Sequence, residues 1–499
     1  MNSVAVKTTP VLALAVSSGV LALLYVTLDA IGSNSLYPLL NRFGPMVLLG
    51  FCIWAAYQLV RDQPLALWSP IPWFFTASAA YFGLGPLSYY FATPESVTFM
   101  DAFHAVNDYV LFRTNLLNVV GIGSVCIGIL LGKTLLTQHS SAQEAPHSLS
   151  VVKRALVVFL VVGGIVKYFF TFPYVLGLLT WTLPGSIQHL SSLLGGAIIL
   201  LFALVHRGET RFRWILYPLI ASELTTGLMT FSKQEVLWTV ITVVLGWYLG
   251  RPRLRVLVMS AVGIVLLYTA ILSPFVSYAR VVVGAFGTND PRVVAQSLQE
   301  FEDVGREQLS VMLPGVQSWW TRLAYSNAQA FAMEEHDRGA LGGTFGLAIY
   351  AFVPRMLYPE KPMMNSGEEF TALVTGEDSY ATGSGIFGEA YWNGGWWAVI
   401  AAGVYVGLVF TAFAAFSIRI IAAGQYIYAP VVMAGIVMGF RPDDWFVPTY
   451  IGSLVEVLAL YCIMKYLFIP LISQKLSDSK PGAVPLSGST STRSAGGVN

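Results

Sequence analysis

Two cations lie close together in the polar stretch VPRMLYPEKP, Arg355 and Lys361. A guanidinium can bind phosphate oxygens in bidentate fashion and an ammonium adds a compact positive charge, so this pair suits a pyrophosphate group. Ser379 and Tyr380 follow and supply neutral groups that can hydrogen-bond to a sugar. The stretch therefore predicts the binding of an anionic headgroup together with a sugar, although a loop this polar is also compatible with simple solvation.

A carboxylate and a tyrosine come next, in the run GEAYWNGGWW that precedes an apolar segment. Glu389 is placed where it could accept a proton from an attacking hydroxyl, and Tyr391 is a candidate substrate-binding residue. The prolines before this run exclude a continuous helix, and the glycines permit tight turns. We therefore expect a structured loop at a membrane surface.

Three further cations stand at the ends of apolar runs: Lys233 in FSKQEVLW, Arg280 after SPFVSYA and Arg441 in GFRPDDWF. A cation so close to hydrocarbon is costly and is often functional. The alternative for Lys233 and Arg280 is snorkelling to the membrane surface. The alternative for Arg441 is a local ion pair with Asp443 or Asp444 in a turn.

Two other ionisable residues lie outside these groups. Lys167 falls in the middle of the apolar run VGGIVKYFF, so it must find a carboxylate, a backbone carbonyl or water inside a helical bundle. His336, in MEEHDRG, lies among acidic residues, and we expect it to be solvated rather than part of a site.

The composition is that of a multi-span membrane protein. Of 499 residues, 55% are hydrophobic and 11% are charged, and the mean hydropathy is +0.65, which is too apolar for a soluble protein. The formal net charge of +1 gives no indication of a nucleic-acid partner. The three cysteines lie in apolar runs without metal-ligand spacing, and no metal site is predicted.

Apolar runs long enough for about 30 Å of hydrocarbon recur along the chain and predict an all-α polytopic fold of about twelve transmembrane helices. They lie near residues 11–29, 45–60, 71–91, 115–132, 155–179, 191–206, 215–231, 235–250, 256–275, 396–417, 426–440 and 449–469. With the N-terminus in the cytoplasm, the basic residues of alternate connections fall on one side, as the positive-inside rule requires. The run at 341–353 would break this parity, so we expect it to be re-entrant or interfacial.

These spans divide the chain into four parts. Residues 1–275 hold about nine transmembrane helices, and 276–395 form a large acidic extracytoplasmic loop with re-entrant or amphipathic helices, one of them near 292–312. Residues 396–470 hold three more spans. Residues 471–499, rich in Ser, Gly and Pro, should form a disordered cytoplasmic tail.

The order of these features resembles that of Wzy-type O-antigen polymerases, also described as oligosaccharide repeat unit polymerases. The matching parts are the polar turn FSKQEVLW, the block of spans that ends in SYAR, and VPRMLYPEKP followed by GEAYWNGGWW. The resemblance covers about residues 220–420, and the first half of the chain matches only in hydropathy. Where the family usually carries arginine in the polar turn, this chain has Lys233.

The resemblance implies a metal-independent, inverting glycosyl transfer at the outer face of a bacterial inner membrane, without a cofactor. Donor and acceptor would be polyprenyl-pyrophosphate-linked glycans in the lipid bilayer, and a flippase and a chain-length regulator would be partner proteins. The cations around the pyrophosphate would be Arg280, Arg355, Lys361 and Arg441. Lys233 would support them, and Glu389 would be the candidate base. The fold would be similar to that of membrane-embedded (GT-C-like) glycosyltransferases, which act by positioning and charge stabilisation.

Two alternatives stay open. A ligase that transfers a finished glycan shares the donor, so only the acceptor separates it from a polymerase. A lipid-linked oligosaccharide flippase or another secondary transporter would instead line a pathway with intramembrane charges, and such transporters commonly contain internal repeats. No internal repeat is evident in the sequence.

Overall fold

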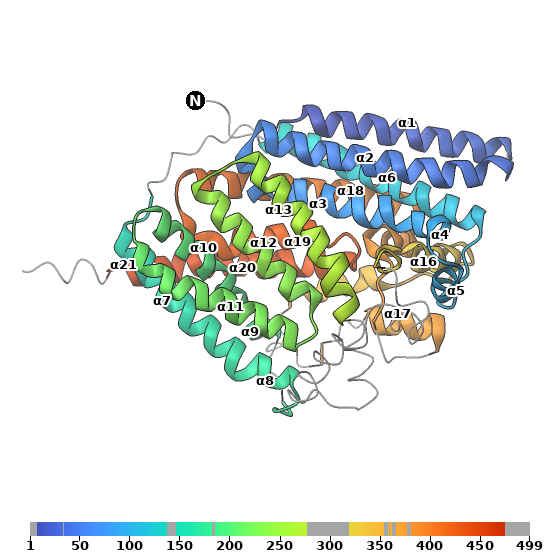
Figure 1. Cartoon of the computed structure of the whole chain (residues 1–499). Coiled ribbons are helices and arrows are strands. Elements are labelled where there is room, and N and C mark those ends of the chain that lie inside the picture. The colour runs from blue at the N-terminus through green and yellow to red at the C-terminus, as the bar shows by residue number, and fades with distance from the viewer. Residues whose placement is uncertain are drawn as a thin grey trace, which may run out of the picture.

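Every regular element among the residues that the structure describes is a helix (Figure 1). The structure is a computed structural model and describes residues 7–32, 34–136, 146–181, 185–276, 319–353, 358, 360–361, 366–376 and 381–474. Eight of the described helices are long and apolar enough to cross a membrane: Thr9–Ile31, Asn34–Asp62, Asp108–Leu135, Leu149–Val175, His189–His206, Leu254–Val276, Gly385–Ala422 and Val447–Ser473. The predicted all-α class is confirmed, and the chain has the helices of a multi-pass membrane protein.

The other four predicted spans are helical but are not among these eight. The run near 71–91 is divided into α3 (Pro70–Ser78) and shorter helical pieces. The helices α11 (Arg213–Met229) and α12 (Lys233–Gly250) carry charged residues, and α19 (Ala429–Phe440) has 12 residues. At about 1.5 Å per residue, α19 is about 18 Å long, which is less than the hydrocarbon thickness. The apolar pattern thus finds these helices but overstates their length or apolarity.

Two long helices, α6 (Asp108–Leu136) and α18 (Gly385–Ala422), pack against each other along much of their length. Glycines bring their backbones together: a Cβ atom on Gly128 would lie 2.2 Å from the carbonyl oxygen of Val404. A Cβ atom on Gly407 would lie equally close to the carbonyl oxygen of Val125, at 2.2 Å. Small residues at such contacts let membrane helices approach closely and gain van der Waals attraction.

Basic residues meet at one end of the bundle, which we call the basic end. The helices α1 (Thr9–Ile31) and α2 (Tyr37–Asp62) pack beside α6. There the Lys7 ammonium lies 3.3 Å from the Asp62 carboxylate, and Lys133 donates a hydrogen bond of 3.2 Å to Thr8. The guanidinium of Arg207 lies over the ring of Tyr426, just beyond the C-terminus of α18. Basic connections that are distant in sequence therefore share one end.

The opposite end, which we call the far end, carries α5 (Pro94–Asp101), α16 (Ser326–Asp337) and α17 (Ser366–Thr375), which lie together in Figure 1. The run predicted to be re-entrant forms a 3-10 helix, Thr344–Phe352, of nine residues. At about 2 Å per residue it is too short to cross the membrane.

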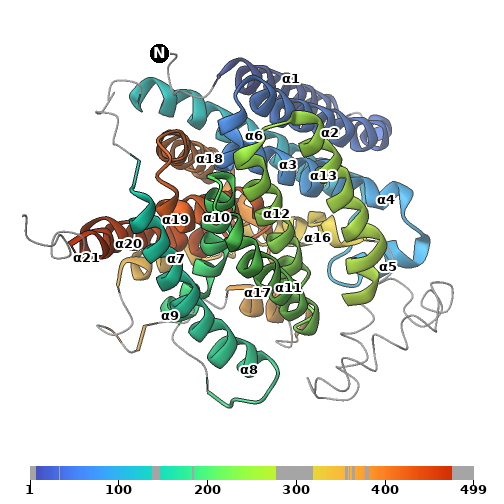
Figure 2. The same cartoon turned by 60° about the vertical axis from the view of Figure 1, so that its left-hand side comes forward.

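A second group of helices lies apart from α1 and α2, and Figure 2 shows α7, α10, α11 and α12 in it. The bounds of the remaining helices are α4 (Ser88–Phe91), α7 (Leu149–Gly164), α8 (Phe172–Val175), α9 (Gly185–Gln188), α10 (Leu193–His206), α13 (Leu254–Leu267), α20 (Ser453–Cys462) and α21 (Ile469–Gln474). The helix α21 continues past the predicted boundary at 470, because apolar residues extend the last span to Ser473.

Helix α18 is broken near its start. Gly394 has φ −168° and ψ 26°, and Gly395 has φ +61° and ψ −153°. The second of these conformations is one that residues with a side chain rarely adopt. The break coincides with the predicted boundary between the loop and the last three spans, but the helix already begins ten residues earlier, at Gly385.

The close contact between α6 and α18 predicts a specific sensitivity to a single methyl group. We expect Gly407→Ala to lower the free energy of unfolding by about 1–3 kcal/mol, because the added carbon cannot fit without moving backbone atoms. The measurement is thermal or denaturant-induced unfolding of the purified protein in detergent. The matched control is Gly50→Ala in α2, where an added Cβ would meet nothing within 4 Å. Equal stability of the two variants would contradict the prediction.

Candidate functional site

Glu389 lies in the first turns of α18, and its side chain is fully buried. One carboxylate oxygen accepts a hydrogen bond of 2.7 Å from the Thr344 hydroxyl, and the other accepts one from the backbone N–H of Phe446. Asn393, one turn along α18, donates to the same Thr344 hydroxyl at 2.7 Å. The carboxylate thus joins α18, the 3-10 helix Thr344–Phe352 and the segment after α19. It can accept a substrate proton only if these contacts open.

Tyr391 belongs to a different cluster, which also holds Arg113 and Asp337. The Tyr391 hydroxyl donates to Asp337 at 3.0 Å and accepts from the Arg113 guanidinium at 3.0 Å. Arg113 also forms an ion pair of 2.6 Å with Asp337. Tyr391 is 3% exposed, whereas the side chains of Arg113 and Asp337 are 27% and 38% exposed. We call these three residues the tyrosine–arginine cluster; a molecule at the far end can reach its charged members.

His336 packs against this cluster, contrary to the expectation that it is merely solvated. Its ring meets that of Tyr391 edge to face at a centroid distance of 5.0 Å, and its side chain is 25% exposed.

Partial burial disfavours the ionised form of Asp337, but the hydrogen bond and charge of Arg113 outweigh it, so the pKa of Asp337 is lowered. Asp337 is therefore ionised at neutral pH and can hold Arg113 in place.

Arg441 lies in the turn GFRPDDWF at the far end, beside two carboxylates. It forms an ion pair of 2.5 Å with Asp444, which confirms the local pair considered for this turn. The Arg441 side chain nevertheless stays 43% exposed. Asp443 is turned inward and accepts a hydrogen bond of 3.1 Å from the Tyr325 hydroxyl. Burial, with the neighbouring charge of Asp444, raises the pKa of Asp443 to about 6.

Lys233 begins α12 at the far end. Its ammonium donates a hydrogen bond of 3.1 Å to the Ser273 hydroxyl and lies 5.8 Å from the centre of the Tyr268 ring. Ser232 caps the helix by accepting a hydrogen bond of 3.2 Å from the backbone N–H of Glu235. Phe231, just before, has φ +49°, a strained value for a bulky residue. The polar turn is thus a fixed structure that directs Lys233 toward the end of the next span along the chain, Leu254–Val276.

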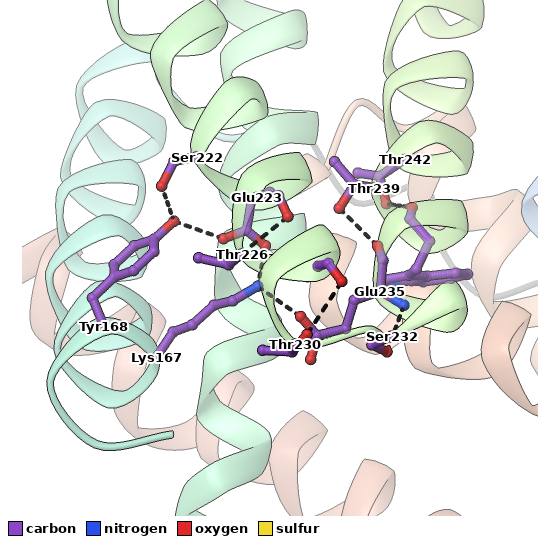
Figure 3. Close-up of polar contacts among 12 residues, drawn as sticks. Lys167, Tyr168, Ser222, Glu223, Thr226, Thr230, Ser232, Glu235, Thr239 and Thr242 are labelled. Atoms are coloured by element: carbon purple, nitrogen blue, oxygen red, sulfur yellow. Dashed lines mark hydrogen bonds and ion pairs between the residues drawn. The ribbon is translucent and has the colours of Figure 1, made fainter. Parts of the chain in front are cut away.

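Lys167 finds two carboxylates inside the second group of helices (Figure 3). Its ammonium lies 2.9 Å from Glu223 and 3.5 Å from Glu235, in a π-helical turn that continues α7. The Tyr168 hydroxyl donates to Glu223 at 2.8 Å and accepts from Ser222 at 2.8 Å. The sequence predicts that this lysine needs a partner. Its partners are the two carboxylates, and the resulting network links the π-helical turn after α7 with α11 and α12 (Figure 3).

The predicted cations are not all within the described part of the chain. Arg280, Arg355, Ser379 and Tyr380 lie outside the described residues, so their proposed roles stay predictions. Lys361 is described, and its ammonium donates a hydrogen bond of 3.2 Å to the backbone carbonyl of Val353. Among the remaining candidates, the structure brings Glu389 close to the Arg441 turn through Phe446. It places Tyr391 in the tyrosine–arginine cluster.

Four ionisable residues of the far end were not predicted as site residues from the sequence: Arg113, Asp337, Asp443 and His336. Arg113 stands at the start of an apolar run, and this position was the available signal, since a cation there needs a partner. Its partners are 224 and 278 residues away in sequence, so the pairing itself was not predictable.

Comparisons with protein-family models, with curated proteins and with solved structures find no match to this chain. The candidate site therefore rests on its own geometry and chemistry.

The lysine network predicts a large difference between breaking and replacing a charge pair. We expect Lys167→Met to lower the free energy of unfolding by about 3–5 kcal/mol, because it leaves two carboxylates near hydrocarbon without their cation. The double variant Lys167→Met/Glu223→Leu should lose less, since Glu235 is 42% exposed and can be solvated. Unfolding in detergent measures both. The control is Arg211→Met, whose side chain is 70% exposed; a Lys167→Met variant as stable as this control would disprove the role of the network.

Asp443 predicts a pH dependence of stability. A carboxyl group whose folded pKa is raised destabilises the fold above that pKa, and the penalty fades as pH falls toward the unfolded value, about 4. We therefore expect Asp443→Asn, which can still accept from Tyr325, to be more stable than the parent at pH 7 and equal to it near pH 4. Unfolding midpoints at pH 4, 5, 6 and 7 test this; a gain independent of pH would contradict it.

Proposed function

We propose that the protein polymerises polyprenyl-pyrophosphate-linked oligosaccharide repeat units into a surface polysaccharide, an O-antigen or exopolysaccharide, by glycosyl transfer at the outer face of a membrane. What supports the proposal most is the gathering of partly exposed charged groups at the far end, away from the basic end. Arg441 and the tyrosine–arginine cluster both lie there. The headgroup of a lipid-linked substrate lies at the membrane surface, where the ends of the spanning helices emerge.

The reaction is a displacement at a sugar carbon. An acceptor hydroxyl oxygen forms a bond to the anomeric carbon of the donor sugar, while the bond from that carbon to the pyrophosphate oxygen breaks. The hydroxyl proton passes to a carboxylate, and polyprenyl pyrophosphate leaves with the bonding electrons as an anion. Cations that are already in place stabilise this departing charge without reorganisation. Arg280, Arg355, Lys361 and Arg441 are proposed for that task, with Lys233 in support.

The role of Glu389 in this proposal depends on its contacts. As a base, its carboxylate must lose the Thr344 or Phe446 hydrogen bond to meet a substrate hydroxyl. While these contacts are formed, it acts as a positioning residue that holds the Arg441 turn through the backbone N–H of Phe446. Arg113 fixes the Tyr391 hydroxyl, so Tyr391 is proposed to bind the sugar rather than to transfer its proton.

The architecture proposed with this function has about twelve spans, in which four shorter or more polar helices complete the eight long ones. It resembles the membrane-embedded, GT-C-like glycosyltransferases, with a large extracytoplasmic loop between residues 276 and 395. The proposed location is a bacterial inner membrane, with both termini in the cytoplasm. The partners are the glycan donor and acceptor, a flippase and a chain-length regulator, and no metal or cofactor takes part.

One observation favours a second candidate, a flippase or transporter of lipid-linked glycans. The network of Lys167, Glu223 and Glu235 places three charges within helices of the bundle, and such charges often line a transport pathway. A ligase differs from a polymerase only in the acceptor. The same experiment separates all three.

The experiment replaces Arg355 or Lys361 with alanine in the cells that produce the protein. We expect long surface glycans to disappear while single repeat units still reach the surface, because the departing pyrophosphate loses a counter-charge. Gel electrophoresis of the surface glycan measures the chain-length distribution. The control is Arg338→Ala, since this arginine is 62% exposed and pairs only within α16 in the described contacts; its glycan should be unchanged.

Three other outcomes would each overturn the polymerase proposal. Lipid-linked repeats that accumulate on the inner leaflet indicate a flippase. Long lipid-linked chains that are made but never transferred to their anchor indicate a ligase. A normal length distribution in both variants shows that Arg355 and Lys361 do not stabilise the departing pyrophosphate.

A further inference from the structure

A pocket of about 580 Å³ opens at the far end, apart from the residues considered so far. Its lining residues are Asn34, Tyr37, Asn107, Asp108 and Tyr109. They come from two places, the turn between α1 and α2 and the start of α6, and the ends of these helices lie beside α4 in Figure 1. The volume is within the range of small-ligand sites.

The lining combines aromatic faces with groups that both donate and accept hydrogen bonds. Tyr109 is 44% exposed, and its ring lies 5.6 Å from that of Tyr37. Tyrosine rings are broad, apolar surfaces with a polar tip, and the C–H face of a sugar ring can stack on them. The amides of Asn34 and Asn107 can pair with hydroxyls in either direction, and Asp108 adds a strong acceptor. None of the five lining residues is cationic, so the pocket suits a neutral, polyhydroxylated ligand rather than a phosphate.

The hydrogen-bonding groups are held in place before a ligand arrives. The Asp108 carboxylate accepts a hydrogen bond of 2.5 Å from the Tyr90 hydroxyl, and the Arg42 guanidinium lies over the Tyr90 ring at 4.7 Å. Asn41 donates to the backbone carbonyl of Asp108 at 2.8 Å. The side-chain oxygen of Asn107 accepts from the backbone N–H of Val110 at 2.9 Å, which orients its amide. Such support lowers the ordering cost of binding.

The pocket adjoins the tyrosine–arginine cluster. Tyr109 and Arg113 are four residues apart on α6, so they lie on the same face of the helix, about 6 Å apart along its axis. Arg113 in turn contacts Tyr391 and Asp337. A glycan that extends from the pocket along this face of α6 meets the partly exposed side chains of Arg113 and Asp337.

We propose that this pocket is a saccharide subsite that holds a neutral sugar of the glycan substrate, one helical turn from Arg113. The assignment of that sugar to the lipid-linked acceptor rests on the proposed function. The saccharide chemistry of the pocket rests on its own lining and can be tested separately.

The test is saturation-transfer NMR on the full chain in detergent micelles, with lactose, maltose and N,N′-diacetylchitobiose as probes. We expect at least one of them to bind with millimolar affinity. Tyr109→Ala should weaken that binding at least tenfold, and Tyr109→Phe should leave it within threefold, because the ring face is kept. Asn34→Ala changes an exposed turn, where the fold is not at risk, and should weaken binding severalfold. Tyr217→Ala, at a 61% exposed tyrosine of α11, is the control and should have no effect.

Three results would overturn the proposal: no binding of any probe, equal binding by the parent and Tyr109→Ala, or competition by inorganic pyrophosphate, which would mark the pocket as an anion site. The glycan-length assay distinguishes this failure from failure of the proposed function. Normal polymerisation with no role of Tyr109 in sugar binding disproves only the subsite. Sugar binding that depends on Tyr109, in a protein that does not extend lipid-linked glycans, disproves only the polymerase.

Discussion

The close approach of α6 and α18 is the constraint on which the far end depends. A glycine that faces a carbonyl oxygen of the partner helix, as Gly128 and Gly407 do, fixes the distance between two backbones and leaves little freedom to slide. The two helices run in the same direction from the far end, so their first turns are held side by side. Arg113 on α6 and Tyr391 on α18 meet because of this contact, 278 residues apart in sequence. The start of α6, which lines part of the pocket, and Glu389 on α18 are therefore also held in position by this pair of helices.

The buried acids at the far end hold a turn in place through hydrogen bonds, even though burial disfavours the ionised form of Asp443. Glu389 accepts the backbone N–H of Phe446, and the backbone N–H of Ile386 donates to the carbonyl of Pro442 at 3.1 Å. Asp443 is anchored by Tyr325. The turn GFRPDDWF is thus held from α18 and from the start of α16. Arg441, which has a long and flexible side chain, is therefore presented from a rigid backbone, and this limits the entropy it loses when it binds an anion.

The sequence predicted the elements well and their contacts poorly. Each of the twelve predicted apolar runs falls on helical structure, because a helix satisfies its backbone hydrogen bonds within the segment and is therefore suited to hydrocarbon. Lys167 was correctly expected to need a partner, since an isolated cation there is too costly. The identity of that partner was not predictable, because Glu223 is 56 residues away and no local pattern couples the two. His336 was set aside because its neighbours in sequence are acidic, whereas its neighbours in space include Tyr391 and Gly395. The acidic neighbours of His336 in sequence therefore did not indicate its contacts in the folded protein.

The glycine break in α18 explains why one helix can serve both the membrane and the site. A Cβ atom on Gly395 would lie 3.0 Å from the His336 ring, and its φ of +61° would strain any residue with a side chain. Because residue 395 is a glycine, the ring of His336 can approach α18 and pack against Tyr391 of the tyrosine–arginine cluster. The break also interrupts the regular backbone between Tyr391 and the apolar turns that follow. The helical turns that carry Glu389 and Tyr391 therefore need not share the axis of the apolar part of α18. The first turns of α18 are therefore oriented by their contacts at the far end. The boundary between these turns and the apolar part of α18 is set by the backbone conformation of Gly394 and Gly395 rather than by a change in hydropathy.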